Sequence, residues 1–260
     1  QKIDQLVNTI DDLNMDAVAL TEHGNMFSVL PYYKQAKKAG IKPIIGCEIY
    51  VAVGSRFEKK TRSDGGWGNN HLILLAQNFT GYKNLMKLVT AGYLEGFYYR
   101  PRIDMDLLRE YSEGLICMSA CLKGVVPEKM LKGDYEGARK EALLFSEIFQ
   151  DRYYLEIQNH GIPEEEQNLK NMKKLSQDLN LPLVCTNDAH YAKKEHWEAH
   201  DIHICLGTGK ERSDPNRLRY ATPEFYFKTQ DEMHKLFKEF PGAIENTRKI
   251  ADSIDITPVS

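Results

Sequence analysis

Apolar residues follow two different periods along the chain, and segments of the two kinds alternate. Short apolar runs typical of strands lie at residues 16–20, 43–51, 71–76, 114–118, 153–157 and 182–186. Elsewhere apolar residues recur three and four positions apart, which is the period of one helix face. These helical stretches lie at residues 3–13, 27–40, 85–89, 138–149 and 169–179. Strands that alternate with helices predict parallel βα units, and therefore an α/β barrel or a doubly wound sheet.

The strand pattern stops after Asp188, and helical signals replace it. Residues 229–232 read Thr-Gln-Asp-Glu, a capping box that predicts the start of a helix. A second helix is expected around residues 244–254. We therefore predict a barrel over residues 1–206 and a short helical extension over residues 207–260.

The charge balance limits how this chain could contact a polyanion. Among 260 residues, 34 are Lys or Arg and 37 are Asp or Glu, which gives a net charge of -3. This excludes affinity from a basic surface that covers the whole molecule, so any nucleic-acid contact must be local. Residues 56–70 are rich in Lys, Arg, Gly and Asn, and we expect them to form a mobile surface loop.

Hydropathy and cysteine usage predict a cytoplasmic protein. No apolar run approaches the roughly 20 residues that a membrane-spanning helix needs, so we expect no membrane partner. The cysteines are widely spaced in a chain long enough to bury a core, which favours free thiols over a disulfide framework. They are Cys47, Cys117, Cys121, Cys185 and Cys205.

Residues able to bind metal fall close to the predicted strands. They are His23, Glu48, His71, Cys121, Asp188 and His190. In parallel α/β barrels the carboxyl ends of the strands form one rim, where side chains distant in sequence converge. Imidazole, thiolate and carboxylate together suit zinc or manganese. His71 fits least well because it precedes its apolar run, so either its strand runs against the others or it lies off the rim.

At these residues the chain resembles the polymerase and histidinol phosphatase (PHP) family, in the version found at the amino end of bacterial replicative DNA polymerases. The resemblance covers nearly the whole chain. Its motifs lie at residues 19–25, 40–48, 71–76, 81–85, 118–122, 156–161, 186–191 and 224–229. It implies a distorted seven-stranded (β/α) barrel that holds two to three divalent metal ions, zinc or manganese, with nine ligands.

The resemblance also implies how the ligands are shared. Glu48 and Asp188 correspond to ligands of one ion. Glu48 as a bridge, with His71 and Cys121, corresponds to a second, and His23 and His190 to a third. The family's first strand adds a His-x-His pair and an acidic residue, which nothing before Ile3 supplies. We interpret this as a chain cut from a longer one, with its first strand missing. Partial metal occupancy is expected, with Glu48, His71 and Cys121 as the most complete set.

The resemblance leaves three functions open. The first is part of a DNA-directed DNA polymerase, a nucleotidyltransferase, in which this domain hydrolyses phosphodiesters as a 3′–5′ proofreading exonuclease. Its catalytic residues would be Asp188, His190 and Glu48. The second is a metal-stabilised scaffold of the polymerase without catalysis, and the third is a stand-alone phosphoesterase acting on a small phosphorylated metabolite.

The first function implies partners and phosphate contacts. The partners would be a DNA 3′ end, the remainder of the polymerase chain and replisome subunits. Candidate contacts to phosphate or DNA are His160, Arg100, Arg102, Lys59, Lys60 and Arg62. For His160 a structural role is favoured over a role as proton donor or phosphate contact, and for the basic residues the alternative is a solvated surface.

Overall fold

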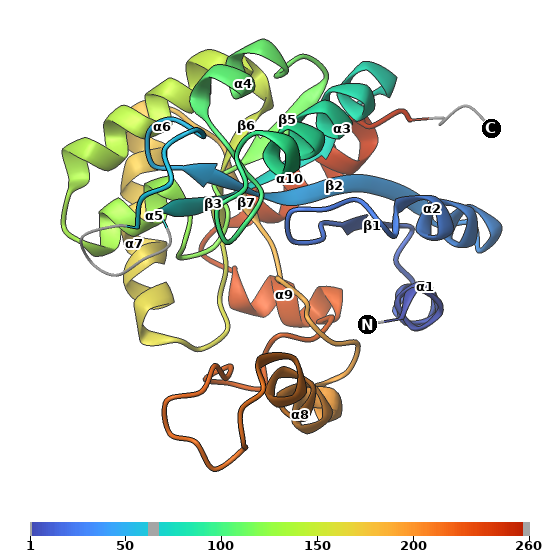
Figure 1. Ribbon diagram of the computed structural model, residues 1–260. Coiled ribbons are helices and arrows are strands. Elements are labelled where there is room, and N and C mark those ends of the chain that lie inside the picture. The colour runs from blue at the N-terminus through green and yellow to red at the C-terminus, as the bar shows by residue number, and fades with distance from the viewer. Residues whose placement is uncertain (1, 62–67, 257–260) are drawn as a thin grey trace.

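The computed structural model describes residues 2–61 and 68–256 as a mixed α/β fold (Figure 1). Its strands are β1 (Ala17–Leu20), β2 (Lys42–Ala52), β3 (Asn69–Ala76), β4 (Arg102–Ile103), β5 (Leu115–Met118), β6 (Tyr153–Ile157) and β7 (Leu183–Cys185). Its α-helices are α1 (Ile3–Asp12), α2 (Val29–Lys38), α3 (Phe79–Leu94), α4 (Met105–Glu110), α5 (Val125–Leu131), α6 (Tyr135–Phe149), α7 (Pro163–Leu179), α8 (Trp197–Thr208), α9 (Gln230–Leu236) and α10 (Pro241–Ser253). Two short 3-10 helices, η1 (Gln150–Arg152) and η2 (Lys194–His196), complete the described elements.

The strands form one curled, seven-stranded sheet, which confirms the α/β prediction. Its hydrogen-bonded order is β1-β2-β3-β5-β6-β7, with β4 paired to β2. Most neighbours are parallel, but β3 runs antiparallel to both β2 and β5. The sheet is therefore mixed. The first of the two possibilities raised for His71, a strand that runs against the others, is confirmed.

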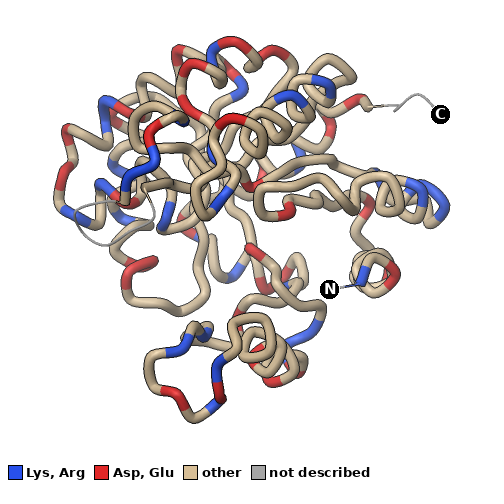
Figure 2. The backbone as a smooth tube through the Cα atoms, viewed as in Figure 1, with Lys and Arg blue, Asp and Glu red and all other residues tan. Residues whose placement is uncertain are grey.

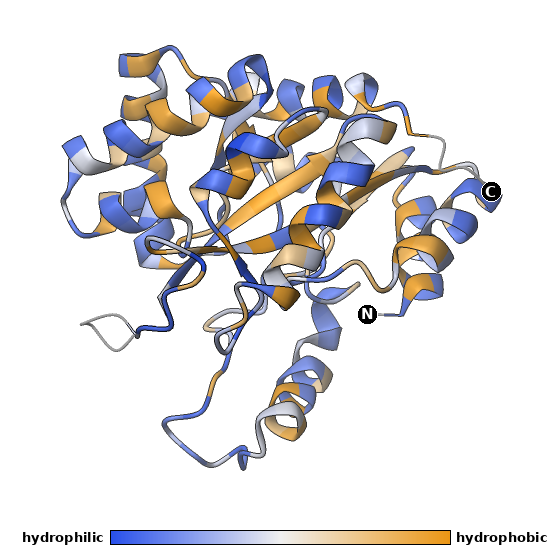
Figure 3. Ribbon diagram, turned by 45° about the horizontal axis from the view of Figure 1, so that its top comes forward, coloured by the Kyte–Doolittle hydropathy of each residue, from blue (hydrophilic) through white to orange (hydrophobic). Residues whose placement is uncertain are grey.

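Alternate residues of β2 separate the two faces of the sheet. Ile45, Cys47 and Ile49 belong to the large core beneath the covering helices. Ile44 belongs to a second apolar cluster on the concave face, where Ile73 and Leu75 of β3 join it. Figure 3 shows the strands as largely hydrophobic, whereas the helices are hydrophobic on one side only. By the two-residue period of a strand, Glu48 and Tyr50 lie on the concave face with Ile44.

Helix α10 closes the apolar end of the concave face. Ile250, Ala251 and Ile254 pack into the cluster that contains Ile44. The Lys42 ammonium at the start of β2 donates a hydrogen bond to the Ala251 carbonyl at 2.6 Å. The last helix of the chain is thus packed against the first long strand of the sheet. The division after residue 206 stays a prediction.

The capping box expected at residues 229–232 is confirmed. The Thr229 hydroxyl accepts a hydrogen bond from the Glu232 amide, and the Glu232 carboxylate accepts one from the Thr229 amide. Helix α8 was not predicted, because Ile202 and Leu206 are exposed and its apolar residues mark no buried face. Figure 1 shows α8 below the sheet, away from α3 and α4. None of the helices in the described part of the chain is long and apolar enough to cross a membrane.

Candidate metal centre

The six side chains predicted to bind metal line one cavity of about 930 Å³. They are His23, Glu48, His71, Cys121, Asp188 and His190. Four of these positions follow the carboxyl ends of three strands: His23 follows β1, Cys121 follows β5, and Asp188 and His190 follow β7. His71 lies near the start of β3, which is the same end of the sheet because β3 is antiparallel. One reversed strand therefore explains why its histidine precedes the apolar run.

Strand register places Glu48 beside His71. In the β2–β3 pair Tyr50 lies opposite His71, and Glu48 lies opposite Ile73. Directly opposed residues share a face of the sheet, and so do residues two apart on one strand. Glu48 and His71 are therefore diagonal neighbours on the concave face. The position of this pair follows from the backbone alone.

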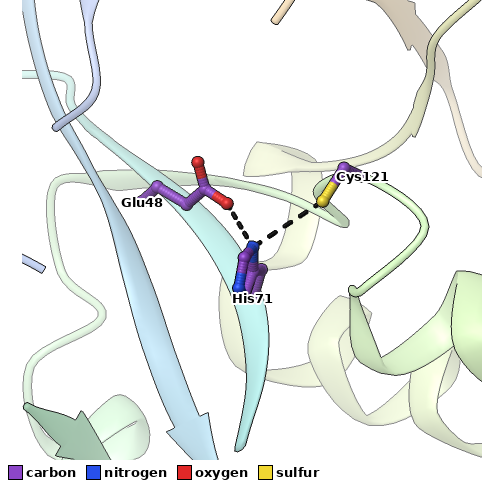
Figure 4. Close-up of side chains that lie close together, drawn as sticks. All are labelled: Glu48, His71 and Cys121. Carbon is purple, nitrogen blue, oxygen red and sulfur yellow. Dashed lines mark hydrogen bonds and ion pairs between the residues drawn. The ribbon is translucent and has the colours of Figure 1, made fainter. Parts of the chain in front are cut away.

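Glu48, His71 and Cys121 form the tightest group of donor atoms (Figure 4). The His71 Nδ1 atom contacts Glu48 Oε1 and lies 3.7 Å from the Cys121 sulfur. One donor atom from each of the three residues lies within 4.8 Å of the others. The structure thus brings together the set that the sequence ranked as most complete.

The two carboxylate oxygens of Glu48 face two different histidines. Oε1 contacts His71, and Oε2 lies 3.3 Å from His23 Nε2. The backbone fixes this second contact, because the Glu48 amide donates to the Glu22 carbonyl and the Gly24 amide donates to the Glu48 carbonyl. A carboxylate with its oxygens directed to two sides is what a bridging ligand requires.

Asp188 and His190 line the cavity from the segment that follows β7. Asp188 has a φ of 43°, in the left-handed region that non-glycine residues seldom adopt. The His190 amide donates to the Phe225 carbonyl at 2.8 Å, and His190 Nδ1 donates to the Asp188 carbonyl at 2.8 Å. This bond assigns the hydrogen to Nδ1 and leaves the Nε2 lone pair of His190 available as a ligand. The His23 and His190 ring centroids lie 6.0 Å apart.

His160 does not contact the cavity as a phosphate ligand, which corrects that prediction. Its side chain is fully buried and stacks on Phe225 with ring centroids 3.9 Å apart. Nδ1 lies 2.6 Å from Glu165 Oε1, and Nε2 lies 2.8 Å from the Asn187 carbonyl oxygen. Both ring nitrogens are therefore occupied by partners within the fold. The structural role favoured for His160 from the sequence therefore fits, and its contact with the Asn187 carbonyl holds the backbone next to Asp188.

Replacing His160 with alanine is expected to lower the free energy of unfolding by about 2–4 kcal/mol, because the buried Glu165 carboxylate would lose its side-chain partner and keep only the backbone amide of residue 160. The double variant His160→Ala/Glu165→Ala should recover part of this loss, since no unpaired buried carboxylate remains. Urea unfolding followed by circular dichroism measures both changes. A loss below about 0.5 kcal/mol in the single variant would show that this pair does not hold the loop.

Arg102 is also misassigned by the sequence. Arg102 is 1% exposed, so its guanidinium cannot contact a nucleic-acid backbone at the surface. The guanidinium donates hydrogen bonds to the carbonyls of Gly96, Arg56 and Glu58 at 2.9–3.1 Å. It therefore fastens the segment that follows β2 to the loop that follows α3. Its role is structural.

The remaining basic candidates differ in their relation to the cavity. Arg100 is exposed and lines it, and its contact with phosphate stays a prediction. Lys59 and Lys60 are exposed, and neither is among the residues that line this cavity. Their contact with DNA stays a prediction. Arg62 lies outside the described residues.

The electrostatics of the cavity suit a divalent cation. Burial raises the pKa of the Cys121 thiol well above its usual value, and the charges of Glu48 and Asp188 raise it further. Burial also raises the pKa of Asp188. Burial acts to raise the pKa of Glu48 too, but the hydrogen bond from His71 and the charge of His23 outweigh it and lower that pKa. A nearby divalent cation would stabilise the ionised form of all three groups, so the donor set fits a metal ion.

Glu156 is a buried acid beside the cavity that the sequence did not identify as a site residue. It lies within the apolar strand β6, one residue before its end, and burial raises its pKa to about 7. Its carboxylate accepts hydrogen bonds from the Ala120 amide, next to Cys121, and from the Thr186 hydroxyl. A charged residue within an otherwise buried strand was the available signal. Glu156 ties the Cys121 loop to the strand that precedes Asp188.

Comparison with known proteins assigns the family. The PHP domain family matches residues 1–160. DNA polymerase III subunit alpha of Borreliella burgdorferi is 50% identical over 254 residues, and that of Treponema pallidum is 45% identical over 255 residues. The subunit of Thermus aquaticus is 42% identical over 243 residues, covering 92% of this chain and 20% of its own length. The chain is matched over 98% of its length by the first two relatives but spans only 22% of theirs. With more than half of its residues matched, this chain belongs to the PHP domain family.

Proposed function

We propose that this chain is the PHP domain of a bacterial replicative DNA polymerase and that its cavity hydrolyses the phosphodiester bond at a DNA 3′ end. The observation that carries the proposal is the position of Glu48. Its two oxygens face His71 and His23, while Cys121, Asp188 and His190 line the same cavity. Donors from four other segments line the cavity around one buried carboxylate, which is the arrangement that a multinuclear site needs.

Each side chain has a role in this proposal. Glu48 would bridge two ions, one held with His71 and Cys121 and one shared with Asp188. His23 and His190 would hold a third. Zinc or manganese bound by these donors would polarise phosphate oxygens and lower the pKa of a bound water. The bond from His190 Nδ1 to the Asp188 carbonyl fixes the ring so that Nε2 is the ligand atom.

The rest of the proposal concerns the longer protein. The relatives are DNA polymerase III alpha subunits more than four times the length of this chain. We propose that the remainder of that polymerase and other replisome subunits are its partners, in the cytoplasm. The proofreading role would place the cavity within reach of a mismatched primer end. The same donors in a scaffold without turnover are the competing function.

An exonuclease assay distinguishes a catalytic domain from a scaffold without turnover. The intact polymerase is given a primer with a mismatched 3′ nucleotide, without nucleoside triphosphates, and the shortened primer is measured on a gel. We expect Asp188→Ala to reduce release of the 3′ nucleotide by at least about 100-fold, because one wall of the centre loses its carboxylate. Synthesis on a matched primer should persist, which shows that the polymerase is folded.

Asp178→Ala is the matched control. Asp178 is an exposed carboxylate of α7 that pairs with Lys174 and does not line the cavity. This variant should release the 3′ nucleotide at the wild-type rate. Equal rates for Asp188→Ala and wild type would leave the scaffold as the function of this domain.

A further inference from the structure

Three exposed basic side chains line the cavity together with the metal-type donors. They are Arg100, Lys123 and Arg219. They come from three different connections, between α3 and β4, between β5 and α5, and between α8 and α9. Cations from three distant segments therefore meet at one cavity of a chain whose net charge is -3. Figure 2 shows Lys and Arg mixed with Asp and Glu over the molecule as a whole.

The backbone of Lys123 is tied to the strand that carries His71. Its carbonyl accepts a hydrogen bond from the His71 amide at 3.0 Å and another from the Asn70 side chain at 3.1 Å. Lys123 is also two residues after Cys121. Its ammonium therefore extends from a fixed point next to two of the three clustered donors.

Aromatic rings connect the two arginines to the same centre. The Arg100 guanidinium lies over the Tyr50 ring, 5.7 Å from its centroid, and that ring lies 5.2 Å from the His71 ring. Arg219 precedes Tyr220, whose ring centroid is 4.7 Å from that of His190. Arg100 is thus linked to His71 through the Tyr50 ring, and Arg219 is adjacent in sequence to the ring that lies beside His190. We call Arg100, Lys123 and Arg219 the basic rim.

The acidic residues of the cavity are more buried or already paired. Glu48 is 6% exposed and contacts both His23 and His71. Glu165 is 4% exposed and is bonded to His160, while Glu128 accepts bonds from Asn70 and Lys132. The candidate metal ligands therefore lie inside the cavity, and the basic side chains lie at its edge. A single phosphate group bound at the metal centre would not extend to the basic rim. A nucleic-acid backbone carries a row of phosphates that could contact the metal centre and the basic rim together.

We propose that the basic rim binds the phosphates next to the scissile one, so that the cavity selects a single-stranded nucleic-acid end over a small phosphate ester. This rests on the proposed function, because the scissile phosphate is assigned to the metal centre. Cations at a cavity edge neutralise backbone phosphates without reading bases, so binding is independent of base sequence. Each neutralised phosphate adds to the salt dependence of binding.

The test is the affinity of this chain for a fluorescein-labelled oligothymidylate, measured by anisotropy at several salt concentrations. For single strands the slope of log K against log salt is about -0.7 per neutralised phosphate. The variant Arg100→Gln/Lys123→Gln/Arg219→Gln should therefore lose about 2 units of slope and bind more weakly at low salt. Lys34→Gln/Lys37→Gln/Lys38→Gln removes the same charge from exposed positions on α2 and should keep the wild-type slope.

The outcomes separate the rim from the proposed function. An unchanged slope in the rim variant, an equal loss in the α2 variant, or no binding by the wild type would overturn the rim. A rim-dependent slope in this chain, with no removal of a 3′ nucleotide by the intact polymerase, would support the rim and reject the exonuclease. Removal of the 3′ nucleotide, together with a salt slope that the rim variant does not change, would support the exonuclease and reject the rim.

Discussion

Replacing Glu48 with glutamine is expected to weaken zinc binding by at least about 100-fold. Loss of a residue that only supports a metal ligand lowers affinity by up to about 100-fold, and Glu48 is proposed to be a ligand itself. The change keeps the shape of the side chain and removes the charge that faces both His71 and His23. Because one carboxylate contacts both histidines, its loss should affect two neighbouring sites together. Competition with a chromogenic chelator measures the affinity of the chain.

Glu128→Gln is the control for this experiment. Glu128 lines the same cavity but does not belong to the cluster of Glu48, His71 and Cys121. We expect its replacement to leave zinc affinity within about threefold of wild type. Cobalt as a spectroscopic probe adds a direct test, since Cys121→Ser should abolish the absorption of a thiolate–cobalt bond. Equal losses in Glu48→Gln and Glu128→Gln would show that the cluster does not hold the ion.

Replacing Arg102 with alanine is expected to lower the free energy of unfolding by about 4 kcal/mol. Three backbone carbonyls would lose their donor, and each buried unsatisfied group costs about 1–3 kcal/mol. A large cavity would also remain, because Arg102 is among the largest fully buried side chains. Arg102→Lys should rescue little, since an ammonium cannot match the fork of a guanidinium.

Arg109→Ala provides the comparison for Arg102. Arg109 is exposed on α4 and pairs only weakly with Asp106, at 3.4 Å. Its loss should change stability by less than about 0.5 kcal/mol. Urea unfolding gives both values. If Arg102→Ala instead kept its stability and weakened DNA binding, the original assignment of Arg102 as a phosphate contact would stand.

The sequence placed the candidate donors near the strands, and the fold brings them to one cavity. His23 and Asp188 could be singled out because each follows an apolar strand, and Glu48 because it is an acid inside one. The role of Arg102 could not, because its burial depends on carbonyls of residues 56 and 58, more than 40 positions earlier. In sequence it stands beside Arg100 with only a proline between them, yet one is buried and the other is exposed.

The basic rim shows the same limit. Lys123 and Arg219 have no distinguishing pattern around them, and only the fold brings them to the cavity that Arg100 lines. His160 presented the opposite problem, since a histidine after a strand resembles a ligand until Glu165 and Asn187 are seen to occupy both ring nitrogens. Short-range patterns reveal strand ends, whereas long-range packing decides what a polar residue does there.

Helix α10 also has a consequence for how the chain is made. The cluster of Ile44, Ile73 and Val184 is covered only when Ile250 and Ile254 are in place. During synthesis on a ribosome the strands emerge before α10. The apolar cluster would therefore stay exposed to solvent and chaperones until α10 has been made. Folding of the sheet is thus coupled to synthesis of the segment that follows the metal-binding residues, so the centre becomes stable only after α10 has been made.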